Sequence, residues 1–136
     1  MSLSDNKAVR YLSASELYGI NDEVTGEQSF VRDLHLLNSA AARPSIILFG
    51  EEQFPTIADK SASLLHSLAY HHLFIDGNKR TALRAVTLFL SVNGYQLIWD
   101  DKTQYDFILE IAQGKYDVSE IAARLTEYIQ PLLTTS

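Results

Sequence analysis

The chain has 136 residues, of which 46% are hydrophobic, and this composition allows one globular domain with a buried core. Its formal net charge of −6 argues against partners such as nucleic acids and anionic membranes, because binding to either needs a basic face. Cysteine is absent, so disulfides and cysteine-ligated zinc are excluded. No apolar segment predicts a signal peptide or a membrane span. We therefore expect a cytoplasmic protein with one domain over residues 1–136.

The first part of the chain carries the signals of two helices. Ser13 and Glu16 have the spacing of a capping box, and a glycine closes the apolar pattern that follows, which predicts a helix over about 14–25. A second run of leucines and alanines predicts a helix over about 32–42. This helix must stop there, because the residue before Pro44 avoids helical geometry.

The middle of the chain combines a β-rich segment with a long helix. Residues of about 45–55 favour strands around Gly50, which predicts a small hairpin or an irregular flap. Thr56 and Asp59 then open a pattern of apolar residues at helical spacing that continues to two adjacent histidines. We expect this helix to carry His72 at its C-terminal end.

Three further helices are predicted in the last part of the chain. Asn78 can cap a helix that stops at Asn93, which precedes a glycine. An extended stretch at 95–99 separates it from two shorter helices over about 102–113 and 118–129. The predicted fold is therefore all-α, with about six helices and one small β excursion.

The strongest functional signal is the run of nine residues from His72 to Arg80. A base, a carboxylate, a flexible glycine and two cations follow one another there, a combination that suits phosphoryl or nucleotidyl transfer and that a packing segment rarely has. Lys79 and Arg80 fall in the first turn of a predicted helix, where cations oppose the helix dipole at about 0.3–1 kcal/mol each. A phosphate bound to the free N–H groups of that turn would offset this cost.

The remaining residues of the run have matching roles in such a site. Gly77 has no Cβ, so a ligand can approach the backbone closely. Asp76 provides a hard oxygen ligand for Mg²⁺, which would be held between this carboxylate and the nucleotide. His72 is the natural base to remove a proton from an attacking hydroxyl.

Neighbouring residues have structural explanations as well. Phe74 lies between polar residues and is expected to anchor the loop in the core. His71 and His72 are not distinguished by spacing, so either can face the cleft. His66 would make a metal site with Asp76, but on an apolar helix a partly buried, hydrogen-bonded histidine is the better prediction. The two cations alone would be an ordinary solvated pair.

The pattern His-x-Phe-x-Asp-Gly-Asn-Lys-Arg-Thr-Ala at 72–82 resembles the signature of the Fic/Doc proteins in the Doc (death-on-curing) form. Flanking residues also look like the family pattern, over most of 11–130. The resemblance implies a compact all-α Fic/Doc domain, in agreement with the helices predicted above.

The resemblance also implies the roles of the site residues. His72 would be the general base on a hydroxyl of a target protein, and Asp76 would carry the metal ion, Mg²⁺. The phosphates of ATP would be held at the start of the following helix, by Gly77, Asn78, Lys79 and Arg80.

Two departures from Fic enzymes proper match the Doc form. Those enzymes usually have a glycine in place of Lys79 and a second arginine in place of Leu83. Loss of that arginine removes a bidentate clamp on the far phosphates. The resemblance therefore implies transfer of the terminal phosphate of ATP to a threonine of elongation factor Tu, a translation factor. Adenylyl or other nucleotidyl transfer and non-catalytic protein binding are the alternatives.

Two residues near the motif are harder to interpret. Arg84 follows Leu83 and points about 100° away from it on a helix, so a solvated side chain is favoured over a replacement for the missing arginine. His35 stands where the family more often has glycine.

The resemblance further concerns regulation and docking. Self-inhibited Fic proteins carry a Ser/Thr-x-x-x-Glu-Gly/Asn helix, which this sequence lacks, so an antitoxin is expected to inhibit in trans by folding a disordered tail into an apolar groove. The flap at 45–55 would dock a target peptide by strand addition. The alternative is an ordinary hydrophobic hairpin that covers the core.

Overall fold

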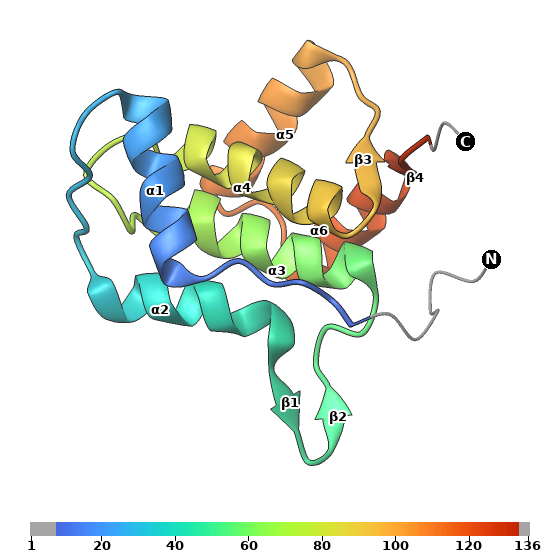
Figure 1. Cartoon of the computed structure of the whole chain (residues 1–136). Helices are drawn as coiled ribbons and strands as arrows, with labels where there is room; N and C mark the ends of the chain where they lie inside the picture. Colours follow the sequence, from blue (N-terminus) through green and yellow to red (C-terminus); the bar gives the residue numbers. More distant parts are fainter. Residues whose placement is uncertain (1–7, 134–136) are drawn as a thin grey trace.

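Within residues 8–133, which the computed structural model describes, six α-helices make up most of the chain (Figure 1). The helices are α1 (Ala14–Thr25), α2 (Leu34–Ala42), α3 (Ile57–Tyr70), α4 (Asn78–Val92), α5 (Asp101–Ala112) and α6 (Val118–Thr126). A 3-10 turn, η1 (Arg43–Ser45), extends α2. Among these residues no helix has the length and hydrophobicity that a bilayer crossing requires. The prediction of a mainly helical fold with about six helices is confirmed.

Local capping sets the helix starts. The hydroxyl of Ser13 accepts the N–H of Glu16 at 3.1 Å, and the Glu16 carboxylate accepts the N–H of Ser13 at 3.0 Å, so the predicted capping box is present. The second helix begins at Leu34 instead of about 32, because the Asp33 side chain caps it by accepting the N–H of Leu36.

Helix α3 lies at the centre of the core. It packs most extensively against α4 and α6 and also contacts α2, while α1 packs against α4 and α2 (Figure 1). Its leucines are almost fully buried, and full burial of such a side chain contributes about 1.5–3 kcal/mol. Phe89 of α4 and Ile121 of α6 are buried in the same cluster. The core thus fixes the end of α3 relative to the start of α4.

The flap is a short antiparallel hairpin of β1 (Ile47–Leu48) and β2 (Glu51–Glu52). Phe49 and Gly50 form its turn with φ of 51° and 78°, as tight hairpin turns require. The hairpin projects from the helices (Figure 1), and the side chains of its first strand and turn are exposed, that of Phe49 fully. The alternative of a hairpin that covers the core is therefore wrong.

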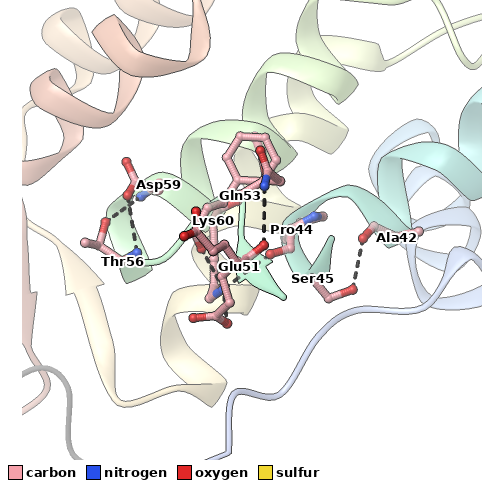
Figure 2. Close-up of polar contacts among 11 residues, drawn as sticks. Ala42, Pro44, Ser45, Glu51, Gln53, Thr56, Asp59 and Lys60 are labelled. Atoms are coloured by element: carbon pink, nitrogen blue, oxygen red, sulfur yellow. Dashed lines mark hydrogen bonds and ion pairs between the residues drawn. The ribbon is translucent and has the colours of Figure 1, made fainter. Parts of the chain in front are cut away.

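Lys60 of α3 clamps the base of the flap (Figure 2). Only 2% of this residue is exposed, and its ammonium donates to the carbonyl of Phe54 at 2.6 Å and to that of Pro44 at 3.4 Å. A carboxylate oxygen of Glu52 lies 3.1 Å from the same nitrogen. Because Pro44 precedes the hairpin and Phe54 follows it, the buried cation holds both of its ends.

A second two-stranded sheet corrects the sequence-based prediction. The helix predicted over 118–129 ends at Thr126, and the chain continues as β4 (Ile129–Pro131), antiparallel to β3 (Tyr95–Leu97). The extended stretch at 95–99 was expected, but its partner was not. The apolar residues keep helical spacing up to 129. Residues 129–131 are nevertheless extended, because they pair with β3, which is remote in sequence.

Candidate functional site

The run from His72 to Arg80 forms the link between α3 and α4. Helix α3 ends at Tyr70, so the exposed His72 lies in a loop two residues beyond the helix and not at the helix end as predicted. The loop leaves helical geometry because its backbone pairs with the segment before α2. The N–H of Arg32 donates to the Leu73 carbonyl at 2.7 Å, and the N–H of Ile75 donates to the Phe30 carbonyl at 3.0 Å.

Two residues lock the shape of this loop. Phe74 is 1% exposed, which confirms that it anchors the loop in the core. The side chain of Asn78 accepts the N–H of Phe74 at 3.0 Å and donates to the carbonyl of Phe74 at 2.9 Å. The three residues between them are thereby held in a fixed turn.

The start of α4 differs from the prediction that Asn78 caps it. Gly77 is the N-cap, and no side chain caps this helix, because the side chain of Asn78 is occupied by the loop. Helical bonding begins with the N–H of Thr81, which donates to the Gly77 carbonyl at 2.8 Å. The N–H groups of the first turn are consequently open to an anion, and a helix N-terminus favours one.

Gly77 is required by packing as well as by conformation. Its φ is 75°, a left-handed value that favours glycine. A Cβ placed there would lie 2.7 Å from Cγ2 of Thr25, at the end of α1. Helix α1 therefore lies directly against the loop that starts α4.

Asn21 of α1 is a member of the site that the sequence did not reveal. It is 2% exposed, and its amide donates to the carbonyl of Asp76 at 2.8 Å and to the hydroxyl of Thr81 at 3.0 Å. It thus joins the loop to the first turn of α4. The only signal in the sequence is a polar residue four positions after Leu17, on the core face of the first helix.

The basic residues of α4 have different surroundings. Arg80 donates to the carbonyl of Val24 at 2.7 Å, at the C-terminal end of α1, where a cation is favourable. Arg84 is exposed, as expected, and forms an ion pair with Glu23 at 3.1 Å. Lys79 is exposed and makes no ion pair with any described residue.

The proposed base and metal ligand are both accessible. His72 is exposed and donates to or accepts from no described side chain. Asp76 is exposed too, and one of its oxygens accepts the N–H of Gly77 at 2.8 Å, which leaves the other free. A lone carboxylate beside an open helix start suits Mg²⁺, which takes one or two carboxylates plus phosphate oxygens.

A histidine-based metal site has no support in the part of the chain described. No group of three or more His, Asp or Glu residues there has metal-binding geometry. His66 is partly buried, and its Nδ1 lies 3.1 Å from a guanidinium nitrogen of Arg43, so it is the hydrogen-bonded histidine that was predicted.

The chain is similar in sequence to known proteins, and the similarity includes the residues of this site. The sequence model described as "Fic/DOC family" matches residues 11–90. The chain is 39% identical over 121 residues to "Toxin Doc" of Mycolicibacterium smegmatis, in an alignment that covers 87% of this chain and 92% of that protein. It is 38% identical over 74 residues to "Protein kinase doc" of Escherichia phage P1, with 54% and 58% of the two chains covered.

Proposed function

Because the chain belongs to the Fic/DOC family, we propose that it is a cytoplasmic Doc-type toxin that transfers the terminal phosphate of ATP to a threonine hydroxyl of elongation factor Tu. The observation that carries this proposal is the open first turn of α4, which has free N–H groups and exposed Lys79 at the end of the loop that contains His72. Two similar proteins, one named as a toxin and one as a protein kinase, support it.

The proposed chemistry uses the geometry of the loop. The phosphates of ATP bind the N–H groups of Asn78 and its neighbours, with the side chains of Lys79 and Arg80 beside them. The threonine oxygen attacks the γ-phosphorus, the bond to the β–γ bridging oxygen breaks, and ADP leaves. A nitrogen of His72 takes the hydroxyl proton.

Asp76 would hold Mg²⁺ against the phosphates. The free carboxylate oxygen lies beside the N-cap Gly77, so a ligand on this helix start and an ion on Asp76 would be neighbours. When bound, Mg²⁺ neutralises charge on the phosphates. The Asn21 hydrogen bond to the Asp76 carbonyl fixes the backbone of this ligand.

The surroundings of Leu83 favour phosphate transfer over nucleotide transfer. Leu83 packs against the core and provides no cation for a nucleotide held in the usual Fic manner. Arg84, the nearest substitute, is engaged by Glu23 at the surface. Adenylyl transfer in the Fic pose would lack its second arginine clamp.

Labelled ATP tests the reaction directly. The protein is incubated with elongation factor Tu, Mg²⁺ and ATP labelled at either the γ- or the α-phosphate, and the acceptor is analysed by mass spectrometry. We expect label from the γ-position alone, on a threonine. Label from the α-position would instead show nucleotidyl transfer, and absence of both would contradict an enzymatic role toward this target.

The base assignment has its own test. His72→Ala should abolish transfer while the circular dichroism spectrum is unchanged, because the side chain is exposed and bonded to no described residue. His35→Ala, a change of another exposed histidine on α2, is the matched control and should keep activity. Equal activity of the His72→Ala variant and the wild type would refute the assignment.

Two partners complete the proposal. An antitoxin inhibits in trans, which the name of the similar protein "Toxin Doc" supports. The target docks along the flap by strand addition, since each flap strand pairs with the other on one side only. The exposed apolar side chains of β1 and its turn support this docking mode.

A further inference from the structure

A pocket of about 350 Å³ lies beside Ile46, at the start of the flap, and His71. Leu36 and Ala40 of α2 and Ile46, which precedes β1, give it apolar walls. His71 lines it too, next to the proposed base. A peptide that extends from β1 toward His72 would therefore cross this pocket, which we call the Arg43 pocket.

Arg43 brings a positive charge into the pocket. One guanidinium nitrogen donates to Ser67 Oγ and to His66 Nδ1, each at 3.1 Å, and the guanidinium lies 5.5 Å from the centre of the Phe54 ring. A guanidinium has no acceptor, so Nδ1 of His66 accepts and this imidazole is neutral. Burial, followed by the charges of Arg43 and His71, lowers the pKa of His66, although Asp117 acts in the opposite direction.

No carboxylate among residues 8–133 forms an ion pair with this cation. Asp59 and Asp117 line a second pocket that Arg43 also lines, but neither carboxylate reaches ion-pair distance of the guanidinium, and each caps the start of a helix by accepting a backbone N–H. A half-buried cation whose protein partners are neutral is an anion site, because partial desolvation without a counter-charge is unfavourable.

We propose that the Arg43 pocket binds an acidic side chain of the target peptide, on the flap side of the threonine that is modified. Its methylene groups would lie against Leu36, Ala40 and Ile46, and its carboxylate would accept from the free N–H groups of Arg43. The buried hydroxyl of Ser67 accepts from Arg43 and donates to no described residue, so it can donate to the same carboxylate. The inference rests on the proposed function, because it specifies the sequence around the modified threonine.

The test measures binding and does not depend on transfer. Fluorescently labelled protein is applied to an array of threonine-centred peptides in which each flanking position is varied in turn. We expect Asp or Glu to be selected at one position on one side of the threonine, with about tenfold stronger binding than Gln there, the value of one charged hydrogen bond.

Two variants on α2 form a matched pair. Ser39 lines the pocket and is exposed, so Ser39→Glu places a negative charge at the rim without changing the bonds of Arg43. This charge repels an acidic side chain of the peptide, and the preference for Asp or Glu should be lost. Asn38→Glu adds the same charge at the preceding position, which is exposed and does not line the pocket, and should keep the preference for Asp or Glu. Arg43→Gln should also lose it, with thermal unfolding recorded to check its fold.

The outcomes separate this inference from the proposed function. Acidic selection that both pocket variants abolish supports the inference, whether or not phosphate is transferred. Absence of acidic selection, or selection that survives Ser39→Glu, overturns it, while label transfer from γ-labelled ATP would still support the kinase proposal.

Discussion

Replacement of Asn21 by alanine tests the link between α1 and the loop that contains the site. The residue is 2% exposed and bonds both the Asp76 carbonyl and the Thr81 hydroxyl. Thr81 is fully buried, so its orphaned hydroxyl should cost about 1–3 kcal/mol. Asp76 lies at the surface, where water can replace the lost donor at little cost.

Helix propensity acts in the opposite direction. Alanine is favoured over asparagine inside a helix by about 0.6 kcal/mol, so the net loss for Asn21→Ala should be about 0.5–2.5 kcal/mol. Asn38→Ala is the matched control, because Asn38 is an exposed asparagine within α2 that gains the same propensity and loses no described bond. The difference between the two variants isolates the buried hydrogen bonds.

Urea unfolding followed by circular dichroism measures both variants. We expect a lower midpoint for Asn21→Ala at an unchanged slope, and a midpoint for Asn38→Ala at or slightly above that of the wild type. Transfer activity of Asn21→Ala should fall by more than the unfolded fraction explains, because displacement of a catalytic group by about 1 Å can cost about 100-fold. Equal midpoints for the two variants would refute the argument that Asn21 braces the loop.

Three further changes probe other parts of the fold. Gly77→Ala should lower the free energy of unfolding by about 1–3 kcal/mol, since the new Cβ combines a left-handed φ with a distance of only 2.7 Å to Cγ2 of Thr25. In a Thr25→Ser background, which lacks Cγ2, the steric part of this loss should disappear and the conformational part should remain. Unfolding midpoints of the double-mutant cycle measure both parts. Lys60→Met removes the ammonium that holds both ends of the flap, so amide hydrogen exchange should accelerate across 46–54 and not in α6. Unchanged exchange rates would contradict the role of Lys60 in holding the flap. The pKa of His66 is lowered in the folded state, so as pH drops below the usual value of 6.5 the unfolded chain binds a proton before the folded one does and the stability should fall. His66→Asn, whose amide oxygen can accept from Arg43, should flatten this part of the curve of stability against pH. A slope that persists in the variant would assign it to other groups.

Local signals in the sequence were sufficient for most helix boundaries. The capping box of Ser13 and Glu16 predicted the first helix to the residue, because both partners lie within one turn of each other. The run from His72 to Arg80 likewise indicated phosphate chemistry without any structure, since an unfavourable pair of cations at a helix start needs an explanation. The roles of its residues remain predictions for the experiments above.

Other features depend on partners that are distant in sequence. The β3 strand turns the end of the last predicted helix into β4, and Lys60 meets the two ends of the flap from a neighbouring helix. No local pattern contains these pairings. Periodicity and local caps therefore give the helices, while the strand β4 and the attachment of the flap depend on hydrogen bonds across the fold.

The same division applies to the candidate site. By itself, the sequence determined which residues form the run and that a helix begins within it. The tertiary structure decided that Gly77, and not Asn78, caps this helix, because the side chain of Asn78 is used to close the loop. It also brought in Asn21, whose bond to Thr81 spans 60 positions, and left the cation of Arg43 with neutral protein partners. Both follow from packing of remote helices, which fixes the partners of a polar side chain only once the chain has folded.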